Sequence, residues 1–287
     1  MPGELVSEHA YPKEGSTIQF ADQRNGWMFG NGIGPAGPWV THDGGVTWRA
    51  DNLPTGMRGP LALAVAAGLV TAVVLDGSEG LHVITQGIDT DPWSDTGVTF
   101  PDNGPAPSAR IVLRADSGWI VAENVSRQSP VRPTPHGARL VGGHWISWQL
   151  PCADTGGVKV AATANDILVA CDSAGPGLGL PLMRSDESAD AYSTAGTAPG
   201  ESVMEAQGFA ANDNGRAVLA AGEDLLVSAQ CCEQWTTAYS SPELAHFRDL
   251  VLPTLSFGVV MQWTANAGSL LVTNDGGASW TPVSFGD

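Results

Sequence analysis

The sequence has little charge and very little lysine. Charged residues make up 15% of the 287 residues, and lysine occurs only at Lys13 and Lys159. Exposed helices rely on lysine, glutamate and arginine, so this composition is a poor match to a helical fold. The chain contains 36 glycines and 20 prolines instead, and both residue types form turns. The composition therefore predicts an all-β fold with many short strands.

Basic side chains are scarce overall. The chain has 13 lysine and arginine residues against 30 aspartate and glutamate residues, which gives a formal net charge of -17 at pH 7. Phosphate groups repel such an acidic surface, so we expect no nucleic-acid partner and no anionic membrane surface. An acidic surface favours solubility and attracts ligands that carry positive charge.

No membrane-spanning segment is predicted. The run LALAVAAGLVTAVVL, residues 61–75, is too short to span a bilayer reliably, and it holds Gly68 and Thr71. Two buried strands that meet near Gly68 explain this run better. Residues 1–15 lack the apolar region of a secretory leader, and we assign them as an N-terminal extension.

The four cysteines do not have the spacing of a zinc site, because the chain contains no Cys-x-x-Cys pair. Cys152 and Cys171 could close one loop, and the adjacent Cys231 and Cys232 could form a vicinal disulfide. An even number of cysteines without metal spacing favours an oxidising compartment. We therefore expect an exported or cell-surface protein whose leader is not part of this chain, with a cytoplasmic protein as the alternative.

Motifs of common catalytic and cofactor sites are absent. The sequence has no Gly-x-Ser-x-Gly elbow, no His-x-His or His-x-x-x-His pair and no EF-hand spacing after its Asp-Gly steps. The segment GNGIGPAG, residues 30–37, contains Pro35 and lacks the strand and helix of a dinucleotide site. We expect no metal and no cofactor.

One phrase occurs twice in the chain. Residues 41–48 read THDGGVTW and residues 273–280 read TNDGGASW. In each copy, threonine and aspartate can accept hydrogen bonds from their own turn, and the glycine pair supplies the positive φ angles of a tight hairpin. The tryptophan starts a strand and is available for the core. The residues in these roles are Thr41, Asp43, Gly45, Thr47 and Trp48 in the first copy, and Thr273, Asp275, Gly277, Ser279 and Trp280 in the second.

The repeated phrase resembles the Asp-box, or BNR, repeat, Ser/Thr-x-Asp-x-Gly-x-Thr/Ser-Trp, at every fixed position. The upstream segment FADQRNGW, residues 20–27, is also similar to that family. The resemblance is to sialidase-type, sortilin-type and photosystem II assembly-factor-type β-propellers, and it is strong over residues 16–54 and 247–285. It implies a box between the third and fourth strands of a blade, and ligand sites on the opposite face.

Aromatic residues extend the repeat through the middle of the chain. Between Trp48 and Trp280, residues Trp93, Trp148, Tyr192 and Trp235 recur about every 43–55 residues, close to the period of propeller blades. SAQCCEQW, residues 228–235, is an eroded copy with Gln230 in place of the aspartate. We predict a single six-bladed β-propeller domain of four-stranded antiparallel blades over residues 16–287, with seven blades as the alternative. The predicted blades cover about 16–54, 58–101, 108–151, 156–198, 202–241 and 246–285.

Candidate ligand residues lie on the face opposite the repeated turns. They come from residues next to the first strands and from loops such as 122–138 and 262–268, and basic residues there could bind a carboxylate or phosphate. Pairing of these basic residues with the many acids between blades is the alternative. The candidates are Arg58, Arg110, Glu123, Arg127, His136, Glu205, Tyr239, His246 and Arg248.

The function predicted from the sequence is non-catalytic recognition. A full set of repeats without a catalytic phrase favours a monomeric module that binds a protein, peptide or glycan around the central channel. The neighbourhood of Tyr239, His246 and Arg248 leaves open a carbohydrate-active enzyme, sialidase-like or another glycoside hydrolase or lyase, with diverged residues. A small-molecule enzyme on a propeller scaffold is a further alternative, because propellers carry many chemistries.

Overall fold

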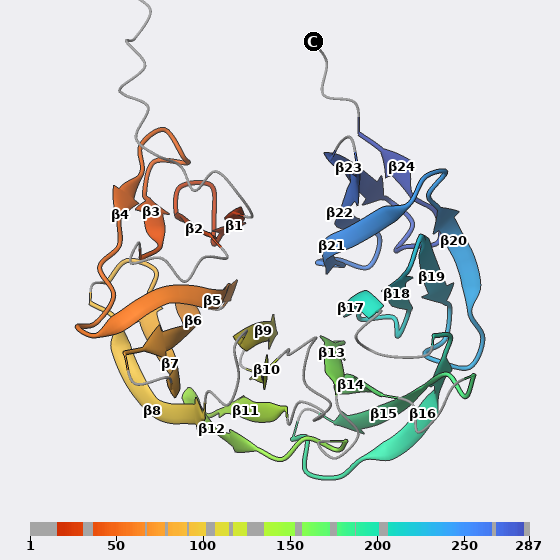
Figure 1. The fold of residues 1–287 in the computed structure, drawn as a ribbon, viewed down its shortest axis with the longest axis horizontal. Coiled ribbons are helices and arrows are strands. Elements are labelled where there is room, and N and C mark those ends of the chain that lie inside the picture. Colours follow the sequence, from red (N-terminus) through yellow and green to blue (C-terminus); the bar gives the residue numbers. More distant parts are fainter. Residues whose placement is uncertain are drawn as a thin grey trace, which may run out of the picture. The chain divides into compact units, whose positions relative to one another are not determined.

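The chain forms a six-bladed β-propeller. The computed structural model describes residues 16–30, 37–66, 68–77, 80–90, 92–101, 107–114, 117–124, 135–152, 157–172, 177–186, 188–200, 206–265 and 268–283. These described residues contain 24 strands and no helix, and the strands form six antiparallel sheets of four consecutive strands each (Figure 1). The predicted fold class is confirmed, with six blades rather than seven.

The chain divides into two compact units, residues 1–111 and residues 112–287. The boundary falls inside the first strand of blade 3. The predicted extension, residues 1–15, lies outside the described residues, and the assignment of residues 16–287 to one domain stays a prediction.

The first unit contains blades 1 and 2. Blade 1 consists of β1 (Ser16–Phe20), β2 (Gly26–Gly30), β3 (Trp39–Thr41) and β4 (Arg49–Ala50). Blade 2 consists of β5 (Met57–Ala66), β6 (Leu69–Asp76), β7 (Gly80–Gly87) and β8 (Ser94–Pro101). The apolar run at residues 61–75 forms the β5–β6 hairpin, which turns at Gly68 with a φ of 80°. The prediction of two strands in place of a membrane span is confirmed.

The second unit contains blades 4 to 6 and most of blade 3. Blade 3 consists of β9 (Pro107–Arg114), β10 (Ser117–Asn124), β11 (His136–Val141) and β12 (His144–Trp148). Blade 4 consists of β13 (Val158–Ala162), β14 (Asp166–Cys171), β15 (Leu180–Asp186) and β16 (Ser193–Ala198). Blade 5 consists of β17 (Ala206–Ala211), β18 (Ala217–Ala221), β19 (Asp224–Ser228) and β20 (Thr236–Ser240). Blade 6 consists of β21 (Ala245–Val251), β22 (Gly258–Thr264), β23 (Gly268–Thr273) and β24 (Thr281–Pro282).

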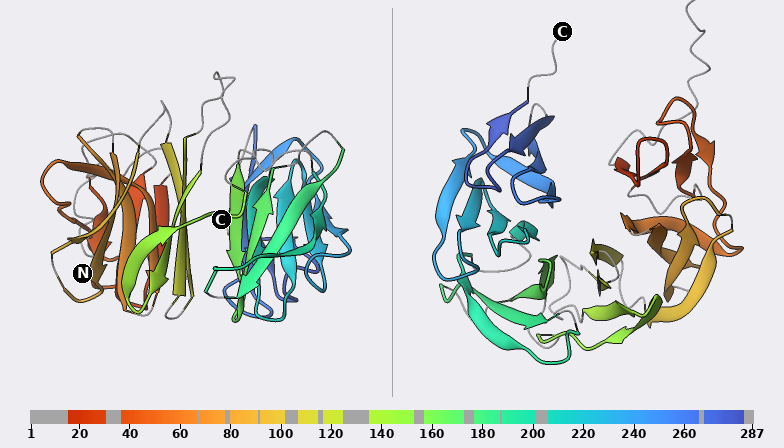
Figure 2. Two further views of the ribbon diagram at one scale, coloured as in Figure 1. Left: turned by 90° about the horizontal axis from the view of Figure 1, so that it is seen from below. Right: turned by 180° about the vertical axis from the view of Figure 1, so that it is seen from behind.

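Each blade has two distinct ends, because its four strands pair in chain order and run antiparallel. The hairpin end carries the turns between strands one and two and between strands three and four. The linker end carries the turn between strands two and three and the connection to the next blade. In the second unit, β13, β17 and β21 are neighbours on the inner side (Figure 1), and the side view shows the turns gathered at the two ends (Figure 2).

The hydrophobic core lies between neighbouring sheets. In the second unit, one buried cluster joins blades 3 and 4, a second joins blades 4 and 5, and a third joins blades 5 and 6; in the first unit, a cluster joins blades 1 and 2. The aromatic residues at blade spacing contribute to these clusters, namely Trp93, Trp148, Tyr192, Trp235 and Trp280. Trp48 is half-buried and packs edge-on against Phe20 of its own blade, with ring centroids 6.1 Å apart.

The two repeated turns have the same hydrogen bonds. In the first turn, the Asp43 carboxylate accepts bonds from the Thr41 hydroxyl at 2.8 Å, the Thr47 amide at 2.9 Å and the Thr47 hydroxyl at 2.6 Å. The Gly45 amide donates to the Thr41 hydroxyl at 2.9 Å, and Gly44 and Gly45 have φ angles of 75° and 89°. Such angles strain any residue with a Cβ atom, which explains the glycine pair.

The second turn repeats each contact. The Asp275 carboxylate accepts bonds from the Thr273 hydroxyl at 2.7 Å, the Ser279 amide at 2.9 Å and the Ser279 hydroxyl at 2.6 Å. The Gly277 amide donates to the Thr273 hydroxyl at 2.8 Å. Both turns lie between the third and fourth strands of a blade and join them at the hairpin end.

Candidate functional site

Seven of the nine predicted ligand residues fall within the described residues. Arg58 and Arg110 belong to the first unit, and the other described candidates belong to the second. Arg127 and Glu205 lie outside the described residues. The described candidates of the second unit are Glu123, His136, Tyr239, His246 and Arg248.

Glu123 has a structural contact between two blades. Its side chain is buried near the end of β10, and its Oε1 accepts a hydrogen bond from the backbone amide of Val158 at 2.7 Å. Val158 is the first residue of β13, so this carboxylate joins blades 3 and 4. His136 begins β11, and burial lowers the pKa of its imidazole. Neither the Glu123 nor the His136 side chain is exposed as a ligand group would be.

The strongest candidate surface of the second unit lies on the inner strands of blades 5 and 6, and we call it the β21 patch. It consists of Gln207 on β17, His246 and Arg248 on β21, and Trp263 on β22. The amide nitrogen of Gln207 lies 3.2 Å from Nδ1 of His246, and the amide oxygen of Gln207 accepts a bond from the Phe247 backbone. Gln207 of blade 5 therefore holds the side chain of His246 and the backbone of β21 in place.

Trp263 gives the β21 patch an exposed aromatic surface. It is the register partner of His246, and 48% of its surface is exposed. The next residue in that row is Gly268 on β23. A Cβ atom at Gly268 would lie 3.1–3.3 Å from three atoms of the Trp263 ring system. The indole therefore lies close to Gly268, and the exposed part of the side chain is available for contact.

Tyr239 does not join this surface. Its hydroxyl donates to Oε1 of Gln262 at 3.1 Å, and its ring packs edge-on against Phe247 in the core between blades 5 and 6. Phe247 and Gln262 are paired in register, one position along from His246 and Trp263. Because side chains alternate between the faces of a sheet, Tyr239 contacts the face opposite to His246. The sequence places these residues close together, but strand alternation separates them.

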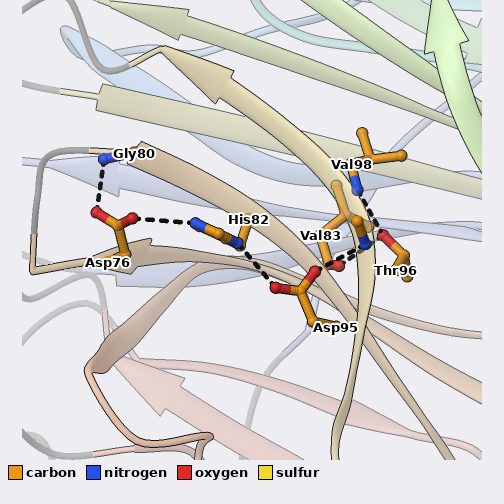
Figure 3. A network of polar contacts seen from close by, with 8 residues as sticks. Asp76, Gly80, His82, Val83, Asp95, Thr96 and Val98 are labelled. Carbon is orange, nitrogen blue, oxygen red and sulfur yellow. Dashed lines mark hydrogen bonds and ion pairs between the residues drawn. The ribbon is translucent and has the colours of Figure 1, made fainter.

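Blade 2 contains a charged network that the sequence analysis missed. His82 on β7 lies between two carboxylates, with Nε2 3.0 Å from Asp76 and Nδ1 3.0 Å from Asp95 (Figure 3). Burial lowers the pKa of His82, but the hydrogen bonds and charges of the two aspartates outweigh it and raise this pKa above its ordinary value. Each ring nitrogen thus faces a carboxylate oxygen, so neither nitrogen is free to contact a substrate. The arrangement suits a structural ion cluster better than a general base.

Arg114 was also missed, although it bridges three blades of the second unit. From the end of β9, its Nη2 donates to the backbone oxygen of Ala162 at 2.9 Å and to that of Ala211 at 3.0 Å, and its Nε donates to Ala162 at 3.3 Å. Ala162 and Ala211 end β13 and β17. One guanidinium thus joins the inner strands of blades 3, 4 and 5 at the hairpin end.

A pocket of about 320 Å³ lies at the hairpin end of blades 5 and 6. Its polar lining comes from the turns of both blades, and Asn212 donates to the backbone oxygen of Leu255 at 3.0 Å. Arg216 donates to the backbone oxygen of Asp275. The lining residues are Asn212, Asn214, Arg216, Ala229, Leu255, Ser256 and Asp275. The resemblance implied ligand sites at the other end of the blades, so these residues were not among the predicted candidates.

No group of three or more His, Cys, Asp or Glu side chains in the described ranges is placed to hold a metal ion. Within those ranges, no helix has the length and hydropathy needed to cross a bilayer.

Comparison with known proteins supports the fold alone. No protein-family model and no curated protein sequence matches the chain. The structure of YCF48 bound to D1 peptide is similar over 93% of this chain and 79% of its own, with 16% identity and a TM-score of 0.58. The β-propeller domain of the trilobed protease from Pyrococcus furiosus is similar over 95% of this chain and 81% of its own, with 8% identity and a TM-score of 0.53. A chain of the nidogen/laminin complex is similar over 93% of this chain and 92% of its own, with 8% identity and a TM-score of 0.51.

Proposed function

We propose that this chain is a non-catalytic recognition propeller that binds an extended peptide segment of a partner protein at the β21 patch. The observation that carries the proposal is the exposed Trp263 beside His246, with Gln207 holding the imidazole in place. Tryptophan is enriched at the energetic centres of protein interfaces, where it contributes a large rigid surface. Arg248 is exposed two residues further along β21 and adds a cationic donor.

Structural neighbours support a peptide as the ligand. YCF48 is described in complex with D1 peptide, and nidogen in complex with laminin. Propellers of this kind therefore serve as binding platforms. The cationic Arg248 of the patch favours a peptide with an acidic residue next to an apolar one.

The polar chemistry of the described residues favours binding over catalysis. The His82 imidazolium is held by two carboxylates, and Glu123 is held by a backbone amide of the next blade. Tyr239 donates its hydroxyl to Gln262 inside the core. These groups are used in structural contacts, so none of them has the free geometry of a general acid, base or nucleophile.

We also propose that the turns at residues 41–48 and 273–280 are Asp boxes. The matching hydrogen bonds of Asp43 and Asp275 support this assignment. The boxes then serve to fix the outer hairpins of blades 1 and 6, and the binding surface lies at the other end of the blades.

The proposal is tested with a random 12-residue peptide library displayed on phage, selected on the folded protein. Peptides enriched on the protein are synthesised, and their affinities are measured by fluorescence anisotropy. We expect the Trp263→Ala variant to weaken binding at least tenfold, because an aromatic anchor contributes about 1.4 kcal/mol or more. Val141→Ala is the control, because Val141 is 46% exposed at the hairpin end of blade 3.

Two results would contradict the proposal. In the first, the selected peptides bind Trp263→Ala and the wild type equally well. In the second, no peptide is enriched, and an array of immobilised glycans gives binding that depends on Trp263. That outcome would replace the peptide by a sugar stacked on the indole.

A further inference from the structure

The turn between β19 and β20 of blade 5 shares one hydrogen bond with the two repeated turns. In those turns, the first glycine donates its amide to the hairpin between strands one and two of its blade, from Gly44 to Arg24 at 2.9 Å and from Gly276 to Ser256 at 2.6 Å. In blade 5, Cys231 makes this bond to Gly215 at 2.8 Å. Cys231 and Cys232 therefore align with the glycine pair, but neither of them has the positive φ angle of those glycines.

The bonds that hold the repeated turns together are replaced in blade 5. Gln230 stands where the other turns have aspartate, and the Ser228 hydroxyl donates to the backbone oxygen of Gln230 at 3.3 Å. Cys231 and Cys232 are joined by a disulfide bond. This turn therefore has a disulfide at the two glycine positions and no aspartate of the kind that holds the other two turns.

The closed turn attaches blade 5 to blade 4. Nη2 of Arg184, on β15, donates to the backbone oxygen of Cys231 at 3.2 Å. Cys232 is completely buried in the core between blades 4 and 5. It packs on Gly196 of β16, where an added Cβ atom would lie 3.3 Å from the Cβ of Cys232 and closer still to its carbonyl group. The contact has no space for a Cβ atom at position 196.

We propose that Cys231–Cys232 is a thiol–disulfide switch that controls how firmly the β19–β20 turn is attached to blade 4. The reaction is exchange with a small dithiol. Its thiolate attacks the sulfur of Cys231, the bond to Cys232 breaks, and Cys232 leaves as a thiolate that takes up a proton. The second thiol of the reagent then attacks the mixed disulfide, so Cys231 is freed and the reagent becomes a cyclic disulfide.

Burial determines which sulfur is attacked and provides an internal control. Cys231 is only half-buried, while Cys232 is fully buried. Both partners of the second disulfide, Cys152 and Cys171, are buried in the core between blades 3 and 4. Access governs the rate of exchange, so the vicinal pair reacts first in the folded protein.

The experiment treats the folded protein with increasing dithiothreitol, traps thiols with iodoacetamide and locates them by peptide mass spectrometry. Hydrogen exchange is measured on the same samples. We expect Cys231 and Cys232 to be alkylated while Cys152 and Cys171 remain joined. Amide exchange across residues 228–235 and 193–198 should then rise about tenfold or more, while exchange across residues 273–280 stays unchanged within about twofold.

Three results would overturn the switch. They are unchanged exchange after reduction of the pair, reduction of the pair only together with Cys152–Cys171, and two free thiols that persist in oxidised glutathione. A double variant, Cys231→Ser with Cys232→Ser, should show the high exchange of the reduced state with and without dithiothreitol.

A second variant remains informative if the serine variant fails to fold. Gln230→Asp with Cys231→Gly and Cys232→Gly converts the turn to the carboxylate-held pattern. It should show low exchange at residues 228–235 with and without dithiothreitol. A response to dithiothreitol in this variant would place the sensitivity elsewhere and overturn the proposal.

Discussion

Replacing Arg114 with methionine should destabilise the second unit more than any surface substitution of the same kind. Methionine keeps an unbranched stem but loses the guanidinium, and with it the bonds to the backbone oxygens of Ala162 and Ala211. A hydrogen bond from a charged donor contributes about 1.5–3 kcal/mol when it is sheltered from water. Arg114 is only partly buried, so we discount two such bonds to a loss of about 2–4 kcal/mol.

The expected signal is a lower unfolding temperature. For a unit of this size, about 1 kcal/mol shifts the midpoint by about 2–4 °C, so Arg114→Met should lower it by about 6–12 °C for a loss near 3 kcal/mol. Circular dichroism and scanning calorimetry would measure the shift. Arg114→Lys should lie between the wild type and Arg114→Met, because a single ammonium group cannot reproduce the fork of a guanidinium.

Arg248→Met is the matched control in the same unit. Arg248 is exposed on β21. Substitutions at exposed positions usually change stability by about 0.5 kcal/mol or less, so this variant should unfold within a few degrees of the wild type. The reasoning is refuted if both methionine variants shift the midpoint equally, or if Arg114→Met unfolds at the wild-type temperature.

Three further predictions concern single side chains. Asp275→Asn should destabilise blade 6 by about 1 kcal/mol at neutral pH. Burial raises the pKa of Asp275, but the hydrogen bonds from Ser279 and Thr273 outweigh burial and hold this pKa at about 2. The difference in stability from the wild type, measured by urea titration, should therefore disappear as the pH falls from about 4 towards 2. For His82 the pH dependence has the opposite direction, because the pKa of this residue is raised in the folded state. The stability difference between the wild type and His82→Gln should be largest at about pH 6 and should decrease as the pH rises towards about 9. A difference that grows with pH would contradict a charged His82 between the two aspartates. Gly196→Ala should cost about 2 kcal/mol or more in thermal unfolding, because the added methyl group meets the backbone of Cys232 and Gly196 has a φ of 150°.

The sequence was sufficient to predict the architecture, because the turns that define the blades depend on residues close together in the sequence. The phrase that contains Asp43 and the one that contains Asp275 each determine one hairpin through contacts between residues at most four positions apart. The aromatic spacing then gives the number of blades. Neither inference needs contacts between distant parts of the chain.

The candidate site depends on distant contacts and was therefore harder to predict. His246 is held by Gln207, 39 residues earlier, and Arg114 reaches Ala211, 97 residues later. Trp263 gave no signal in the sequence, because Trp27 and Trp119 also fall outside the blade spacing and are buried. Tyr239 was grouped with His246 because they are near in sequence, but strand alternation places its contacts on the other face of blade 6.

The contacts between hairpin turns and neighbouring blades suggest one common packing rule. In blade 6, the turn contributes Gly277, and a Cβ atom there would lie 2.5 Å from a methyl group of Val218 on blade 5. In blade 5, the turn contributes Cys232, and the glycine is Gly196 on blade 4. Each contact thus has a glycine on one side, because close packing leaves no room there for a second Cβ atom. Cys231 and Cys232 do not have the positive φ angles of the glycine pair, so the blade 5 turn follows a backbone path of its own, and Gly196 on blade 4 supplies the space that the Cys232 backbone needs.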